Sequence, residues 1–110
     1  WLESNIVMCD NPLLIVDCES FELQLLDPGR VPSLTKASMI VECHDCMIEG
    51  ITDTLETRFQ DTHDIQRIKQ GPKDPYQFEI LEDFSDADKW ALVAEGRPSA
   101  MTWLYMVPKQ

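Results

Sequence analysis

The chain has few glycines, and their spacing excludes the common nucleotide-binding loops. Its 110 residues include only four glycines, at positions 29, 50, 71 and 96. The dinucleotide fingerprint G-x-G-x-x-G and the phosphate loop G-x-x-x-x-G-K both need closely spaced glycines, which this chain does not have. The sequence therefore contains no glycine-rich cradle for a nucleotide cofactor.

Basic residues are also scarce, which argues against polyanionic partners. Nine Lys and Arg residues stand against 20 Asp and Glu residues, for a net charge of -11, and none of the basic residues precedes Arg30. Nucleic-acid binding depends chiefly on Lys and Arg side chains that neutralise phosphates. We therefore expect no nucleic-acid partner and no anionic membrane surface as a partner.

Long apolar runs are absent as well. The longest run, Leu13 to Val16, is far below the roughly 20 residues that cross a bilayer, and the first residues do not resemble a signal peptide. We expect a soluble, cytoplasmic protein with one α/β domain over residues 1–110, because the hydrophobic content of 44% suffices for a core. Reduced thiols are expected, since Cys9, Cys18 and Cys43 lie in or beside apolar runs.

Four segments are predicted to be strands, and helical segments alternate with them. Residues 12–17 and 37–43 are continuous apolar runs, which are typical of strands that are buried on both faces. Residues 63–68 and 102–107 are the other two. Helices are expected around Phe21 to Leu26, Ser33 to Lys36 and Ile51 to Phe59, and after the N-cap Ser85, where the last helix buries Trp90. This alternation predicts an α/β layer arrangement with helices on both faces.

Polar side chains follow the first two predicted strands. Ligands of open α/β sheets bind outside the carboxyl ends of the strands. If these two strands are neighbours, Asp17, Glu19, Glu42, His44 and Asp45 converge on one edge of the sheet. Such a cluster suits a general base, an acceptor for a ligand hydroxyl, or an oxygen site for a cation. The alternative is structural, since a carboxylate such as Glu22 near a helix N-terminus supports the helix and solubility.

The run Cys43-His44-Asp45-Cys46 invites a zinc interpretation, but it supplies only half of a structural site. An alternating strand end explains the same residues without a metal. His63, at the end of a predicted helix, is expected to act as a cap. The preferred interpretation therefore includes no metal. A hydrolase that holds a cation through Asp17, Glu19 and Glu42 is the least favoured alternative.

Several elements of the chain, in order, resemble the carboxyl-terminal half of class I S-adenosylmethionine-dependent methyltransferases. The similar segments are residues 14–22, 25–28 and 40–45, and they are similar to a poorly characterised bacterial group with Asp-x-Glu-Gly-x-Glu and Val-Glu-x-His-Asp elements. Thr62-His63, Arg97-Pro98 and Trp103-Leu104 also have counterparts there. The resemblance extends over about residues 12 to 109.

The resemblance implies a fold and a function. It implies strands four to seven of a Rossmann-like sheet of order 3-2-1-4-5-7-6, with strand seven antiparallel, in a parent enzyme that methylates a small-molecule acceptor. Asp17, Glu42 and His44 would be catalytic. Asp17 and Glu19 would lie at the cofactor S-adenosylmethionine, and Asp45 and Glu22 at the substrate.

Two departures from the pattern matter. Ser20 stands where the group has glycine, and the glycine-rich loop that holds the cofactor has no counterpart. We therefore expect the chain by itself to be inactive. The edge of its first strand would be bare, and we expect either residues 1–11 or a second copy of the chain to cover it. The alternative function is a non-catalytic acidic protein-interaction domain with the same fold.

Overall fold

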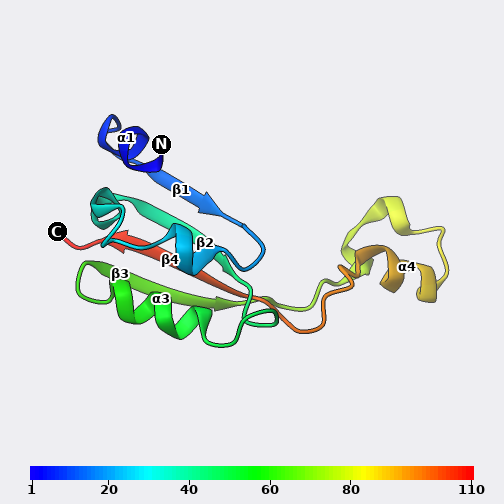
Figure 1. Ribbon diagram of the computed structural model, residues 1–110. Helices are drawn as coiled ribbons and strands as arrows, with labels where there is room; N and C mark the ends of the chain where they lie inside the picture. The colour runs from blue at the N-terminus through cyan, green and yellow to red at the C-terminus, as the bar shows by residue number, and fades with distance from the viewer.

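The computed structural model describes residues 1–110, and four strands form one open, mixed sheet (Figure 1). The strands are β1 (Leu13–Val16), β2 (Ser38–Cys43), β3 (His63–Lys69) and β4 (Thr102–Pro108). Their order in the sheet is β1-β2-β4-β3. β1 and β2 are parallel, whereas β4 is antiparallel to both of its neighbours. The predicted α/β class is confirmed, and all four predicted strands are present.

Short helices connect these strands. They are α1 (Leu2–Val7), α2 (Glu22–Leu25), the 3-10 helix η1 (Pro32–Lys36), α3 (Ile51–Phe59), the 3-10 helices η2 (Pro75–Gln77) and η3 (Glu79–Leu81), and α4 (Asp86–Val93). None of them has the length and apolar character that crossing a bilayer would require. The helix predicted over residues 21–26 is a single turn, which Asp27-Pro28-Gly29 follows.

The core lies on one face of the sheet. Ile51, Leu55 and Phe59 of α3 are fully buried, as their spacing of four residues predicts for an amphipathic helix. They share one core cluster with Met39 of β2 and Leu104 of β4, and α1, α2 and η1 contribute to the same cluster. Because side chains alternate along a strand, these strand residues all point to one side of the sheet.

The opposite face of the sheet is open. Ile15 is 72% exposed and Leu13 is 58% exposed, although both belong to an apolar strand, and Tyr105 and Ile68 are also exposed. Ile15 lies opposite Ile40, which in turn lies opposite Tyr105, so these residues form an apolar row across the sheet. The prediction of helices on both faces is therefore wrong. The reason is that α1, α2, η1 and α3 all pack on the same side.

Residues 70–101 form an arm that extends away from the sheet and carries η2, η3 and α4 (Figure 1). The longest dimension of the molecule is 51 Å and the radius of gyration is 17.1 Å, against roughly 13 Å for a compact domain of about this length. Ser85 caps α4 by accepting from the Asp88 amide, as predicted. The predicted burial of Trp90 is wrong: it is 50% exposed, because α4 packs against η2 and not against the sheet.

The outer edge of β1 is free of backbone partners, since β1 is the terminal strand and pairs only with β2. Residues 2–7 form α1, which packs against η1. There the Glu3 carboxylate accepts hydrogen bonds from the backbone N–H and the hydroxyl of Ser33, at 3.1 and 2.7 Å. The amino-terminal segment therefore does not extend the sheet as a strand beside β1. Coverage of the edge by a second copy of the chain, the other alternative, stays a prediction.

Candidate functional site

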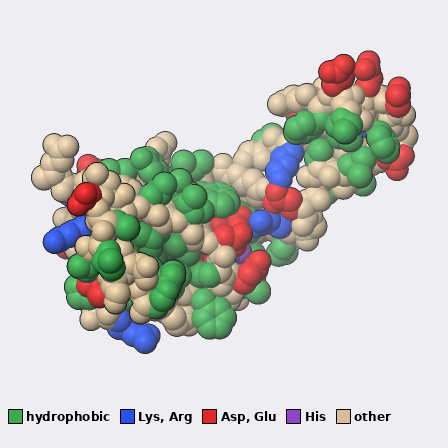
Figure 2. Space-filling view, turned by 90° about the horizontal axis from the view of Figure 1, so that it is seen from above, with side chains coloured by type: hydrophobic (Ala, Val, Ile, Leu, Met, Phe, Trp, Pro, Cys, Tyr) green, Lys and Arg blue, Asp and Glu red, His purple; other side chains and the backbone are tan.

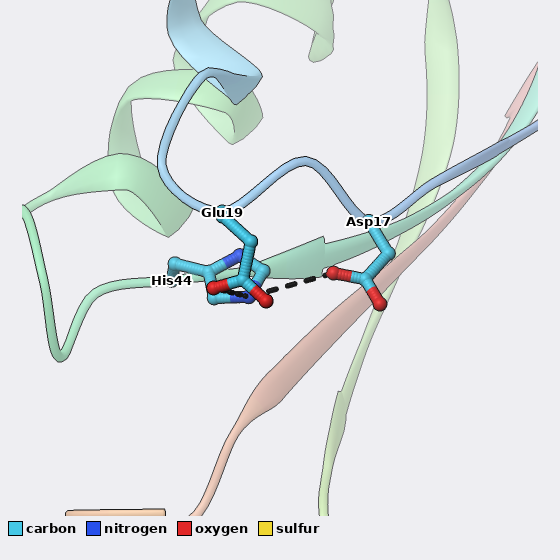
Figure 3. Close-up of side chains that lie close together, drawn as sticks. All are labelled: Asp17, Glu19 and His44. Carbon is cyan, nitrogen blue, oxygen red and sulfur yellow. Dashed lines mark ion pairs between the residues drawn. The ribbon is translucent and has the colours of Figure 1, made fainter.

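The carboxyl ends of β1 and β2 lie side by side and bring two polar segments together. The two strands are parallel and Val16 lies opposite Val41, so Asp17 and the residues after it meet the end of β2. Asp17 and Glu19 approach His44 from the loop after β1 (Figure 3). In the space-filling view, acidic side chains gather close to where the arm leaves the body (Figure 2).

His44 is the centre of this cluster. Its side chain is almost completely buried, and its Nδ1 lies 2.5 Å from Oε1 of Glu22. Its Nε2 faces three further carboxylates: Oδ1 of Asp17 at 3.5 Å, Oε2 of Glu19 at 3.6 Å and Oε2 of Glu42 at 3.9 Å. The imidazole is therefore surrounded by four acidic side chains, two from the loop after β1, one from α2 and one from β2.

Glu22 lies behind His44 and is fully buried at the first turn of α2. Its Oε1 also accepts a hydrogen bond from the Ser20 amide at 3.2 Å, and its Oε2 is buried with no hydrogen-bond partner. The interpretation of Glu22 as a solubility residue is wrong, because no part of the side chain reaches solvent. A buried carboxylate on one ring nitrogen orients the imidazole and determines which nitrogen carries the proton.

The loop after β1 makes a tight turn with an uncommon backbone conformation. Glu19 has φ of 50° and Ser20 has φ of 77°, both in the left-handed region. An L-residue pays roughly 1–2 kcal/mol in that region, whereas glycine does not. Ser20 is the position where the resembled group has glycine, and its conformation is the one that glycine favours. The turn places the Glu19 carboxylate beside His44.

Glu42, at the end of β2, is 2% exposed and forms an ion pair with Arg97. Nη1 of Arg97 lies 2.5 Å from Oε1 of Glu42, and Nη2 lies 3.4 Å from Oε2. Arg97 also contacts Glu95, at 2.7 Å from Nε. No role for Arg97 was predicted from the sequence. A signal was present, because a glutamate inside an apolar strand needs a cationic or hydrogen-bonding partner.

Asp45 does not join the cluster. Its Oδ1 accepts a hydrogen bond from the Thr52 amide at 3.1 Å, and its Oδ2 accepts one from the Thr52 hydroxyl. Both oxygens thus satisfy the first turn of α3, which begins after Gly50. A contact between Asp45 and a substrate stays a prediction, as do the catalytic and binding roles of the cluster residues.

The cysteines of the Cys-x-x-Cys run do not form a site together. Cys43 belongs to the core and Cys46 is exposed. Burial is the main cause that raises the pKa of the Cys43 thiol to about 11. The side chains placed to hold a metal are Asp17, Glu19 and His44, whose potential ligand atoms all lie within 4.8 Å of one another.

His63 is structural and is not a cap of the preceding helix. It begins β3, is 1% exposed, and its Nε2 lies 2.9 Å from the carbonyl oxygen of Ala37. Its Nδ1 lies 2.8 Å from the Thr62 hydroxyl, and its ring packs edge-on against Phe59. Burial lowers the pKa of His63, although the bond to Ala37 opposes this shift. The neutral imidazole therefore links β3 to the residue just before β2.

A cavity of about 460 Å³ adjoins the cluster, and Glu19, His44, Cys46 and Arg97 are among its lining residues. A larger cavity, of about 540 Å³, lies between α1 and η1. Two carboxylates, Glu3 and Asp10, line that second cavity, and Glu3 already binds Ser33. The cavity of about 460 Å³ is the one that adjoins the His44 cluster.

Comparisons with known proteins add no relative to this picture. A scan against protein-family models, a search of curated proteins and a search of solved structures each found no match to the chain. The similarity to methyltransferases therefore rests on the residues quoted above.

Proposed function

We propose that the chain is the carboxyl-terminal half of a methyltransferase-like α/β domain. The parent domain would transfer a methyl group from S-adenosylmethionine to a small-molecule acceptor. One observation carries the proposal: the sheet has the order β1-β2-β4-β3 with β4 antiparallel. The resembled sheet contains the same neighbours in the order four, five, seven, six, and its strand seven is antiparallel. In this comparison β4 would correspond to strand seven.

The uncovered parts of the sheet support the same proposal. In the resembled enzymes strand four pairs with strand one, which corresponds here to the free edge of β1. Doubly wound sheets also carry helices on both faces, whereas one face is bare here and exposes Ile15 and Leu13. A preceding half-domain would cover both the edge and the open face.

The polar cluster would serve the acceptor side of that enzyme. Asp17 and Glu19 extend from the end of β1, where the cofactor would lie, and Glu42 and His44 lie at the end of β2. Because the sulfonium is already reactive, methyl transfer needs chiefly proximity and orientation. His44 can accept a proton from an acceptor hydroxyl or amine, since Glu22 binds its other ring nitrogen.

The residues of this chain do not by themselves fit the cofactor. Gly29 follows α2, and Gly71 and Gly96 belong to the arm. Gly50 alone lies between a strand and the α-helix that follows it, and no second glycine is near it, so the closely spaced glycines of a cofactor loop are absent. In this proposal only Asp17 and Glu19 would contact S-adenosylmethionine. The isolated chain would then be inactive, and its contribution is the acceptor side.

A second function is favoured by the arm. Tyr76, Phe78, Phe84 and Trp90 are all at least 47% exposed there, and large apolar side chains gathered on a surface mark interaction sites. Hydrophobic side chains are visible on the arm beside several acidic ones (Figure 2). The chain would in that case be a non-catalytic, acidic protein-interaction domain.

Calorimetry with S-adenosylmethionine tests the first proposal, in this chain and in a longer chain that includes the upstream coding region. We expect no binding by residues 1–110 and micromolar binding by the longer chain. Binding by the 110 residues alone would contradict the claim that the cofactor half lies elsewhere.

The longer chain also separates the two functions. The substitution Asp17→Asn alters a half-exposed side chain and should leave the fold intact. Loss of methyl transfer without a change in unfolding temperature supports the enzyme. If the longer chain neither contains a glycine-rich turn nor binds the cofactor, the interaction domain is the better function.

A further inference from the structure

Three side chains at the carboxyl ends of β1 and β2 have the composition of a metal site. This inference does not rest on methyl transfer, and with a metal on Nε2 His44 would be a ligand in place of a base. We propose that Asp17, Glu19 and His44 bind a divalent transition-metal cation, with Zn²⁺ as the best match. Their ligand atoms lie within 4.8 Å of one another (Figure 3).

The distances leave room for an ion. Nε2 of His44 lies 3.5 Å from Oδ1 of Asp17 and 3.6 Å from Oε2 of Glu19, and these distances are longer than a good hydrogen bond. Two ligand atoms that each lie about 2.1 Å from a tetrahedral zinc ion are separated by roughly 3.4 Å. The two separations from Nε2 match that geometry more closely than the roughly 3.0 Å between neighbouring ligands of an octahedral magnesium ion.

Nδ1 of His44, the ring nitrogen that does not face Asp17 and Glu19, contacts a carboxylate, as is common in metal sites. The Glu22 carboxylate lies 2.5 Å from Nδ1 and can accept its proton in a hydrogen bond, so Nε2 is the ring nitrogen that faces Asp17 and Glu19 and is available to a metal. Metal-bound histidines commonly bind a carboxylate in this way. The His44 side chain is 4% exposed, and its Nε2 makes no hydrogen bond. Because Nε2 faces the carboxylates of Asp17 and Glu19 without a hydrogen bond to either, a cation between these groups would be favourable.

The charge of the cluster is not compensated by the protein. Asp17 and Glu19 form no ion pair with a Lys or Arg, because Arg97, the nearby cation, binds Glu42 and Glu95. Glu22 also keeps one buried oxygen without a partner. A divalent ion would neutralise the two carboxylates that face His44.

The donor set also selects the class of ion. One imidazole nitrogen and two carboxylate oxygens suit a borderline cation such as Zn²⁺, whereas Mg²⁺ and Ca²⁺ prefer oxygen ligands alone. Three protein ligands with an open fourth position are typical of catalytic zinc sites. Glu19 and His44 also line the cavity of about 460 Å³, from which a water molecule or a ligand oxygen can take that position.

Zinc binding is measured by competition with a chromophoric chelator, on the chain with the exposed Cys9 and Cys46 replaced by serine. This double substitution removes the two exposed thiols. If Co²⁺ then gives no thiolate-to-metal absorption band, Cys18 and Cys43 are excluded as metal ligands. We expect one equivalent of Zn²⁺, bound more tightly than Mg²⁺. Asp17→Asn and Glu19→Gln should each weaken binding at least tenfold.

The variants keep the test interpretable. The side chains of Asp17 and Glu19 are 52% and 75% exposed, so their amide variants should fold, and equal unfolding temperatures verify this. Glu79→Gln and Asp83→Asn, on the exposed arm, are controls that should leave the affinity unchanged. Less than a tenth of an equivalent of bound zinc, or equal affinity in all variants, would overturn the proposal.

Discussion

Oε1 of Glu22 lies 2.5 Å from Nδ1 of His44, and both side chains are almost completely removed from solvent. The two residues come from different segments, α2 and the end of β2, so this contact joins the loop after β1 to the neighbouring strand. The pair orients the imidazole towards Asp17 and Glu19. Loss of the contact between Glu22 and His44 should therefore lower the stability of the fold and also disturb the arrangement of His44 relative to Asp17 and Glu19.

The first prediction concerns that pair. Glu22→Ala should lower the free energy of unfolding by about 3–5 kcal/mol, because it leaves a buried imidazole without its partner. Glu22→Gln retains an oxygen acceptor for Nδ1 and should cost less. Urea unfolding measures both. Glu19→Gln changes an exposed side chain and serves as the control, with an expected change within about 0.5 kcal/mol. An equally small effect of Glu22→Ala would show that the pair does not stabilise the fold.

The second prediction concerns the turn after β1. Ser20 has φ of 77°, so Ser20→Gly should raise the free energy of unfolding by up to about 1 kcal/mol through relief of the left-handed conformation. Ser20→Val should lower it, because a β-branched residue fits this region poorly. Gly50→Ala is the matched control, since Gly50 has φ of 85° and the substitution should be destabilising. Thermal unfolding of the three variants checks the signs, and a destabilised Ser20→Gly would contradict the prediction.

The third prediction is a pH dependence that arises from His63. Burial lowers its pKa below the ordinary value of 6.5, so the unfolded chain binds a proton more readily than the folded one. The stabilisation is therefore present above pH 6.5 and is lost as the pH falls from 6.5 towards the lower pKa of the folded state. His63→Gln should flatten this part of the profile of unfolding free energy against pH. A profile with the same slope in both proteins would assign the effect to other groups.

The fourth prediction concerns the reactivity of the thiols. Cys9 and Cys46 are exposed and should react rapidly with a thiol reagent at pH 8, whereas Cys43 should react only after unfolding. Burial raises the pKa of Cys43 to about 11 and also raises that of Cys18. Between pH 9 and 11 the folded state keeps the Cys43 proton that the unfolded state loses, so stability should fall as the pH rises. Rapid reaction of all four thiols in the native protein would contradict the described core.

The fifth prediction concerns the open face and the edge of β1. Sedimentation at micromolar concentration should show association of two copies, because an unpaired apolar strand templates pairing. Ile15→Lys places a charge on the open face, where Ile15 is 72% exposed, and should weaken association without destabilising the monomer. Asp64→Asn, on an exposed position of β3, is the control. A monomer whose β1 amides are nevertheless protected from exchange would show that another segment covers the edge.

Local patterns were sufficient for most of the elements. The apolar run Leu13–Val16 and the spacing of Ile51, Leu55 and Phe59 predicted β1 and α3 within a residue, since strand and helix periods depend only on nearby residues. The Ser85 cap is equally local. Burial was predicted less well, because an apolar residue such as Ile15 or Trp90 is the same in sequence whether or not another element covers it.

The sequence by itself determined that acidic residues and a histidine follow the first two strands, because each lies directly beside an apolar run. Only the tertiary structure decided how they are arranged. The parallel register of β1 and β2 brings Glu22 onto His44, the left-handed turn at Ser20 returns Glu19 to it, and Arg97 reaches Glu42 from 55 residues away. Asp45 is drawn instead to Thr52. These contacts join distant parts of the chain, and their energies depend on packing that no local pattern contains.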